Sequence, residues 1–155
     1  MKLHSTLIAV NDLEKSIEFY KNILDQEVVL DLGWNKFMSG GFSIQKNFEV
    51  LLGIDKKDII QKPNNMELYF EVDDFDTFVK KLEKYNVEYV HPPKKYDWQQ
   101  RVVRIYDPDY HIIEIGESMK VIALRYLNEG YSVEQTAEII QHPIEFVKGC
   151  IENNN

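Results

Sequence analysis

An internal repeat is the feature of this sequence that most constrains its fold. Residues 10–13 (VNDL) and 72–75 (VDDF) share one pattern: the end of a strand, an acidic helix cap and the first apolar residue of a helix. The second copy begins at position 72, which is 62 positions after the first at position 10. A repeat of this length predicts two copies of one β-α-β-β-β module.

The first copy is expected to hold one helix and several strands. Strands are predicted over 2–10, 27–32, 36–39 and 42–46, and a helix should begin after the N-cap residue Asp12. Residues 48–54 are expected to extend the last strand or to form a short edge strand. The polar stretch 55–65 is predicted to be a loop between the modules.

The second copy repeats this order. We predict a strand over 66–72 and a helix after Asp74 that runs to Tyr85. A short strand over 88–90 should be interrupted by His91-Pro92-Pro93, with His91 exposed in that loop. Two strands joined by the turn 107–110 complete the copy.

Together these elements predict an α+β fold. Each module has a single helix, which can cover only one face of its sheet, so the other face must meet the partner module or line a cavity. We therefore expect one domain over 1–117, with modules at about 1–54 and 66–117, whose paired sheets enclose a cleft. Residues 118–155 form a separate helical tail.

The bulk composition excludes several classes of protein. The net charge of −8 argues against nucleic acid or an anionic membrane as the main partner. Cys150 is the single cysteine, so neither an internal disulfide nor a thiolate metal cluster can form. The N-terminus resembles a strand more than a signal peptide, and no stretch approaches the length of a membrane span. These observations indicate a cytoplasmic protein.

Glu114 is the most conspicuous polar residue in a predicted strand. Its neighbours Ile113 and Ile115 point to the opposite face, because strand side chains alternate. If the isoleucines face a helix-covered core, Glu114 faces whatever the other side encloses. A carboxylate there requires a cation, a donor or a proton. The alternative is a solvated sheet face.

The motifs V-x-D-L-E-K-S-x-x-F-Y (10–20) and D-P-D-x-x-I-I-E (107–114) resemble the vicinal-oxygen-chelate superfamily. That superfamily includes glyoxalase I, bleomycin- and fosfomycin-resistance proteins and extradiol dioxygenases. The resemblance covers residues 2–117 and implies the paired-sheet fold, a small-molecule ligand and, in many members, one divalent metal ion. It also implies a homodimer, because a second chain often completes the cleft. The Gly usual in the turn is replaced by Tyr110, so a different turn type is expected.

The resemblance also implies which residues face the cleft. The metal-ligand positions of the family fall on Ser5, Gln45, Glu67 and Glu114, a set without imidazole. Zinc and nickel sites usually contain nitrogen or sulfur donors, so Mn²⁺ or Mg²⁺ would suit this set better. Three interpretations remain: a metal-free cleft in which Glu67 and Glu114 act as catalytic or binding carboxylates, a metal site on the same two residues, or salt bridges to Arg101 or Arg104.

Further ligand-binding candidates surround these positions. Tyr69 shares the strand face of Glu67, and Trp98 is expected to stack on a ligand at the mouth of the cleft. Arg101 and Arg104 could hold an anionic group, although only one of them can face the cleft because their positions differ in parity. The competing interpretation is a solvated hairpin with strand arginines.

The tail contains a pattern similar to a helix-turn-helix. A break at Gly130, a capping box at Ser132 and Gln135, and a third helix after Pro143 are predicted. From Met119 onward the tail carries three basic and five acidic residues, so phosphate would be repelled. We therefore expect a helical appendage that packs on the domain or on a dimer partner.

Three functions remain open at this level. The first is a protein that binds a small molecule in the cleft, with no assigned activity. The second is a metal-dependent lyase similar to glyoxalase I (lactoylglutathione lyase), and the third is a regulatory protein that acts through its tail. The sequence does not decide whether the chain is an enzyme, although the absence of His at Ser5 argues against the lyase.

Overall fold

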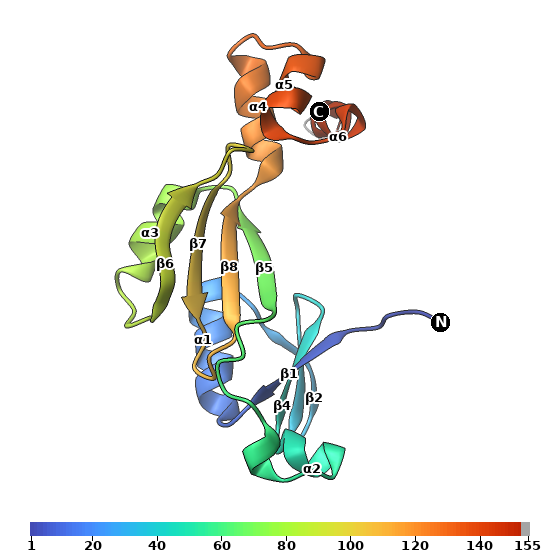
Figure 1. The fold of residues 1–155 in the computed structure, drawn as a ribbon, viewed down its shortest axis with the longest axis vertical. Helices are drawn as coiled ribbons and strands as arrows, with labels where there is room; N and C mark the ends of the chain where they lie inside the picture. Colours follow the sequence, from blue (N-terminus) through green and yellow to red (C-terminus); the bar gives the residue numbers. More distant parts are fainter. Residues whose placement is uncertain (153–155) are drawn as a thin grey trace. The chain divides into compact units, whose positions relative to one another are not determined.

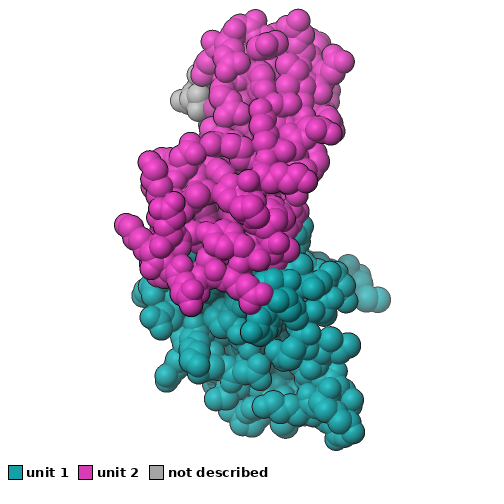
Figure 2. Space-filling view, turned by 60° about the vertical axis from the view of Figure 1, so that its left-hand side comes forward, with its two compact units in different colours: residues 1–67, 106–112 teal, residues 68–105, 113–155 magenta. Residues whose placement is uncertain are grey.

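The structure is a computed structural model that describes residues 1–152, so the last three residues of the expected tail lie outside the described part. The chain divides into two compact units (Figure 2). Unit 1 comprises residues 1–67 and 106–112, and unit 2 comprises residues 68–105 and the chain from 113 onward. The order of elements in Figure 1 confirms the two β-α-β-β-β modules and the helical tail.

The first module forms a four-stranded sheet in the order β1-β4-β3-β2. Its strands are β1 (Thr6–Val10), β2 (Val28–Leu32), β3 (Asn35–Met38) and β4 (Phe42–Lys46). β1 and β4 are parallel, and the other pairs are antiparallel. Ile8 lies opposite Ile44, and both are buried. The first strand is therefore shorter than the predicted 2–10.

Helix α1 (Leu13–Leu24) covers one face of this sheet. It begins as predicted at Asp12, whose side chain accepts hydrogen bonds from the amides of Glu14 and Lys15. Its buried Tyr20 packs on Phe42 of β4, with ring centroids 5.1 Å apart. The helix thus supplies the apolar cover for the buried side chains of β1 and β4.

The segment after β4 is a helix, so the prediction of a strand over 48–54 was wrong. Helix α2 (Phe48–Leu52) is followed by a short 3₁₀ turn, η1 (Lys56–Asp58), in the loop. Asn47 and Gly53 adopt left-handed backbone angles at its two ends, which breaks the extended run of β4. Val50, Leu51 and Leu52 remain exposed. Because the helix buries no apolar face, its sequence does not show the apolar spacing that predicts an amphipathic helix.

The second module repeats the topology in the order β5-β8-β7-β6. Its elements are β5 (Glu67–Val72), α3 (Phe75–Leu82), β6 (Tyr89–Lys95), β7 (Arg101–Tyr106) and β8 (Ile112–Glu117). Asp74 caps α3 as predicted. The helix ends at Leu82, one turn before the predicted Tyr85.

Pro92 and Pro93 do not interrupt the edge strand of the second module. β6 runs through Pro92 and Pro93, and the pairing register with β7 shifts between Tyr89 and His91 and again between His91 and Lys94. Prolines are tolerated at bulges in an edge strand, where no ladder hydrogen bond is lost. The predicted break was therefore wrong, and His91 is partly buried instead of exposed.

The tail forms the three predicted helices, α4 (Met119–Asn128), α5 (Val133–Ile140) and α6 (Ile144–Glu152). Ser132 and Gln135 make the expected capping box at the start of α5. The helices share one apolar core of buried residues: Met119, Ile122, Ala123, Ala137, Ile140, Val147 and Cys150. Burial raises the pKa of the Cys150 thiol, which keeps it protonated at neutral pH. None of the helices in residues 1–152 is long and apolar enough to cross a membrane.

The turn 107–110 belongs to unit 1 and packs on α1. Asp109 accepts hydrogen bonds from the backbone amide and side chain of Asn11 at 2.9 and 2.7 Å, and from Ser16. Tyr110 has φ of 66°, so it adopts the left-handed conformation for which the family usually uses Gly. The expectation that a different turn type would spare Tyr110 a positive φ was therefore wrong.

Candidate functional site

The second sheet presents Glu114 on the face that α3 does not cover. Ile113 and Ile115 are fully buried, and Glu114 lies between them on the opposite face by strand alternation. Only 8% of Glu114 is exposed, so its carboxylate is not simply solvated. We call the side of the second sheet that faces away from α3 the open face.

Arg104 on β7 neutralises this carboxylate. Its Nη2 donates a hydrogen bond to Glu114 Oε2, and the two side chains form an ion pair. Its Nη1 donates to the hydroxyl oxygen of Tyr96 at 2.7 Å and meets Nε2 of His91 at 3.0 Å. The structure therefore realises the salt-bridge interpretation for Glu114, with Arg104 as the partner.

His91 has a defined tautomer in this arrangement. A guanidinium nitrogen only donates, so Nε2 of His91 must accept from Arg104. Its Nδ1 lies 2.8 Å from the Pro92 carbonyl oxygen, which only accepts, so Nδ1 carries the proton. His91 is thus held as a neutral ring beside the Arg104–Glu114 pair.

A second polar group lies around Gly116 of β8. Tyr69 donates its hydroxyl to Glu71 at 2.6 Å and accepts a hydrogen bond from Gln100 at 2.7 Å. A Cβ at Gly116 would lie 2.5 Å from the Gln100 amide nitrogen and 3.1 Å from the Tyr69 ring, so a larger residue here would have to displace the Gln100 amide. Burial and the bond to Glu71 raise the pKa of Tyr69 to about 12, and this phenol remains protonated at neutral pH.

Arg101 belongs to the other side of the sheet. It binds Glu117 through Nε and Nη2 at 3.0 and 3.1 Å, and it also binds Asp76. Its guanidinium lies over the ring of Phe75 on α3. This position agrees with the predicted difference in parity between Arg101 and Arg104, so Arg101 does not share the face of Glu114.

Trp98 lies in the hairpin between β6 and β7. Its ring stacks on Tyr96 with centroids 4.4 Å apart and an angle of 17° between the planes. The indole also packs against the apolar core of the tail, and its Nε1 donates to Gln100 at 3.0 Å. The indole that was predicted to stack on a ligand is therefore packed within the protein.

The candidates of the first module bond to their own sheet. Ser5 donates to the backbone oxygens of Thr6 and Gly41, and the side-chain oxygen of Gln45 accepts from Asn35 at 3.0 Å. Gln45 is buried and opposite Ala9, on the face away from Ile44. Glu67 is exposed at the start of β5.

The side chains present are a poor fit for a metal ion. Within residues 1–152, no three His, Cys, Asp or Glu side chains gather in a group that could hold one. Glu114 already binds a guanidinium, and a divalent cation would have to displace or repel that charge. Ser5 and Gln45 use their oxygens in hydrogen bonds to the first sheet.

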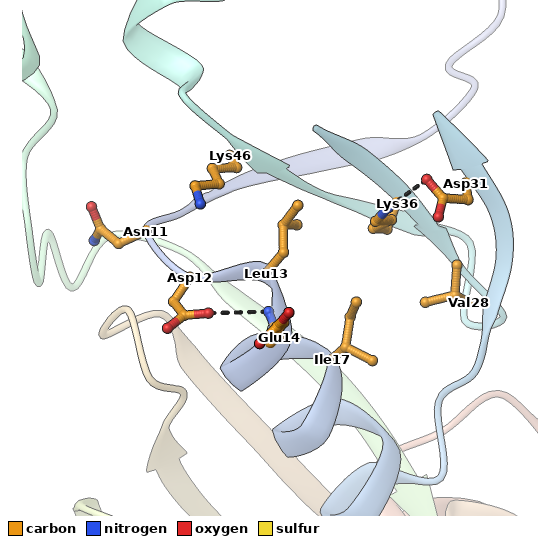
Figure 3. A pocket seen from close by; sticks show the side chains of 9 residues that line it. All are labelled: Asn11, Asp12, Leu13, Glu14, Ile17, Val28, Asp31, Lys36 and Lys46. Carbon is orange, nitrogen blue, oxygen red and sulfur yellow. Dashed lines mark hydrogen bonds and ion pairs between the residues drawn. The ribbon is translucent and has the colours of Figure 1, made fainter. Parts of the chain in front are cut away.

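A hollow of about 630 Å³ lies in unit 1 beside the first turn of α1 (Figure 3). Leu13, Ile17 and Val28 provide its apolar side. Its Lys36 is paired with Asp31, as the dashed line in Figure 3 marks, and Asp12 is used as the helix cap. Two of the charged side chains that line this hollow, Lys36 and Asp12, are therefore already engaged within the protein.

Sequence reasoning missed three residues of the open face: Tyr96, His91 and Gln100. A signal existed for Gln100, which shares the parity of Arg104 and Glu114 and directly precedes β7. Tyr96 and His91 gave no such signal, because two bulges in β6 shift the register that relates them to β7.

Comparisons with known proteins agree with this architecture. Residues 3–120 match the model of the glyoxalase-like domain. The uncharacterized protein YraH of Bacillus subtilis (strain 168) is 29% identical over 124 residues, which cover 74% of this chain and 97% of YraH.

Two solved structures from Agrobacterium tumefaciens illustrate the range of the likeness. A protein of unknown function from strain C58 is 33% identical with a TM-score of 0.66, covering 76% of this chain and 94% of that chain. A lactoylglutathione lyase is 22% identical with a TM-score of 0.58, covering 76% and 93%. The second likeness shows the fold alone. The family match spans most of the chain, and we conclude that this chain belongs to the glyoxalase-like family within the vicinal-oxygen-chelate superfamily.

Proposed function

We propose that this chain binds a small polar organic molecule on the open face of its second sheet, without a resident metal ion. The observation that carries the proposal is the ion pair between Arg104 and Glu114. The carboxylate that the family resemblance offers to a metal is here already compensated by a fixed cation. The electrostatic environment therefore favours a ligand without a strong net positive charge.

The hydrogen-bonding groups of the open face define the chemistry of such a ligand. Tyr96 accepts from Arg104 through its oxygen, so its own O–H can donate to a ligand. Glu114 uses Oε2 for Arg104, and Oε1 can accept from a ligand donor. Tyr69 is half exposed and offers aromatic surface. A molecule with one donor, one acceptor and an aromatic or apolar body matches these groups.

Other expectations from the resemblance join this proposal. We propose that Ser5, Gln45 and Glu67 also contribute to ligand binding, and that the chain works as a cytoplasmic homodimer. Light scattering at micromolar concentration that gives twice the molar mass of one chain would support the dimer. A monomeric mass would count against it.

Native mass spectrometry with elemental analysis of the purified protein tests the binding proposal. We expect a co-purified organic mass and no stoichiometric divalent metal. Arg104→Met should lose that mass, because it leaves Glu114 uncompensated and frees Tyr96. Lys95→Met is the matched control on an exposed position of β6 and should retain it. A stoichiometric metal that Glu114→Gln removes would overturn the proposal.

A lyase is the second candidate, and it is favoured by the fold likeness to the lactoylglutathione lyase of A. tumefaciens. The resemblance implies that such an enzyme needs a metal ion and a catalytic base. Formation of lactoylglutathione that depends on added Mn²⁺ or Mg²⁺ would support it. A regulatory role of the tail is the third candidate, although the tail's excess of acidic residues speaks against DNA.

A further inference from the structure

We infer that the three C-terminal helices position the binding groups of the open face, and that Trp98 transmits this support. The inference deepens the proposed function and rests on it for its biological meaning. Its structural content is a continuous chain of contacts within unit 2. This chain of contacts runs from the core of the tail, through Trp98, to Arg104 and Glu114.

The first link joins the tail to the hairpin between β6 and β7. Trp98 packs against the apolar core of α4, α5 and α6, together with partly buried side chains of those helices. Tyr126 of α4 donates its hydroxyl to Gln99 of the same hairpin at 3.0 Å. Gln99 has φ of 71°, so this hairpin holds an uncommon backbone conformation beside the tail.

The second link joins Trp98 to the ion pair. The indole stacks on Tyr96, and the Tyr96 hydroxyl accepts from Arg104 at 2.7 Å. Arg104 in turn binds Glu114 and meets His91. A flexible arginine side chain needs several partners to keep one rotamer, and Tyr96 is one that the tail holds in place.

The third link joins Trp98 to the group around Gly116. Its Nε1 donates to the Gln100 oxygen, which orients the amide so that Nε2 donates to Tyr69 and to the Glu117 carbonyl. The same indole therefore orients both polar groups of the open face. Ser118, which precedes α4, also bonds to the Val72 carbonyl of β5 at 2.9 Å, so the tail is tied to the strand that carries Tyr69.

This arrangement explains why a small-molecule domain would keep a helical tail. Binding groups that are fixed in advance lose less conformational entropy when a ligand binds. If the tail fixes Trp98, loosening of the tail core should release Tyr96 and Arg104. Trp98 is thus a positioning residue, and it is not itself placed to touch the ligand.

The neutral His91 ring gives a readout that needs no ligand. ¹⁵N resonances of the imidazole distinguish a ring protonated only on Nδ1 from a mixture of tautomers. Ile140→Ala makes a cavity in the tail core, and Ile44→Ala makes one of the same kind in the first sheet, since both residues are fully buried. Both variants should be measured at the same interval below their own melting temperatures.

We expect the single Nδ1-protonated tautomer in the parent and in Ile44→Ala, and its loss in Ile140→Ala. Trp98→Leu leaves the tail core sequence intact, so it tests the link directly and should show the same loss. An unchanged His91 signal in both Ile140→Ala and Trp98→Leu would overturn the inference. An absent co-purified ligand would instead overturn the proposed function and leave the His91 result to stand.

Discussion

Tyr20 of α1 donates its hydroxyl to the carboxylate of Asp107 over 2.7 Å, although the two residues are 87 positions apart in the sequence. Asp107 also accepts from Nδ1 of His111 and from the amides of Asp109 and His111. Burial raises the pKa of Tyr20 well above its usual value, and the neighbouring Asp107 adds to this shift. A protonated phenol and a saturated carboxylate thus fix the turn 107–110 on the first helix.

Tyr20→Phe should destabilise the protein by about 1 to 3 kcal/mol, because it removes a donor from a buried carboxylate while keeping the ring. Equilibrium urea unfolding measures this change. Tyr89→Phe removes the same atom from a partly exposed tyrosine and should stay within about 0.5 kcal/mol of the parent. Equal stabilities for the two variants would show that the Tyr20 hydroxyl contributes nothing to the folded state.

The local features of the fold were predictable because their determinants are adjacent in sequence. Asp12, Asp74 and the pair Ser132–Gln135 cap the helices that the pattern placed there. The partners of the D-P-D turn were not predictable. Asn11 and Tyr20 are joined to Asp109 and Asp107 only by the tertiary fold, and no local pattern connects them.

The errors in the prediction have particular physical causes. Phe48–Leu52 is only five residues long with Glu49 as its one polar residue, too short for a helical period to show, and Val50, Leu51 and Leu52 remain exposed. The strand was predicted to end at Pro92 and Pro93 because proline cannot donate a hydrogen bond to a regular strand pairing. β6 is an edge strand, and it accommodates both prolines where its pairing with β7 is irregular.

The candidate site was predictable in part. Strand alternation correctly separated Glu114 from Ile113 and Ile115. It also separated Arg101 from Arg104, although it could not say which arginine meets the carboxylate. The packing of Trp98 against the tail was not predictable, because it depends on the tertiary position of α4 to α6.

The end of α5 offers a stabilising substitution. Gln141 ends the helix with φ of 55°, and its side chain is exposed. Gln141→Gly should stabilise the protein by about 0.5 kcal/mol, because glycine adopts the left-handed conformation without a Cβ clash. Thermal unfolding measures the effect. The matched substitution Gln141→Ala keeps the clash and should not stabilise; if alanine stabilises as much as glycine, the backbone explanation is wrong.

Glu117 predicts a pH dependence of stability. Its side chain is 3% exposed and binds Arg101 and Arg125. Burial alone would raise the pKa of Glu117, but the hydrogen bonds and charges of the two arginines outweigh it and lower the pKa below the ordinary value of 4.5. A group with a depressed folded-state pKa stabilises the fold above its unfolded pKa, and this contribution is lost as the pH falls through the folded value.

Glu117→Gln should therefore destabilise the protein at pH 7 by about 2 kcal/mol, because the three hydrogen bonds from the two arginines lose their acceptor charge. Below pH 4.5 the difference between parent and variant should shrink. Melting temperatures measured from pH 7 downward test both points. Glu18→Gln on the exposed side of α1 is the control and should follow the parent. A Glu117→Gln deficit that does not change with pH would contradict the charge argument.

Substitutions at Arg104, Glu114 and Glu67 distinguish an ion pair from a metal site at Glu114. Glu114→Gln leaves the Arg104 guanidinium without its carboxylate and should destabilise the protein by about 2 to 4 kcal/mol. Arg104→Met combined with Glu114→Leu removes both charges and should recover most of that loss, because no buried charge remains unpaired. Glu67→Gln, at an exposed position, should change stability by less than about 0.5 kcal/mol.

Thermal unfolding of the parent and the three variants with and without Mn²⁺ completes the test. If the ion pair is correct, Mn²⁺ leaves all four melting temperatures unchanged. If Mn²⁺ instead raises the melting temperature of the parent and not that of Glu67→Gln or Glu114→Gln, the two carboxylates share a cation, and the metal-free site proposed for Arg104 and Glu114 is wrong.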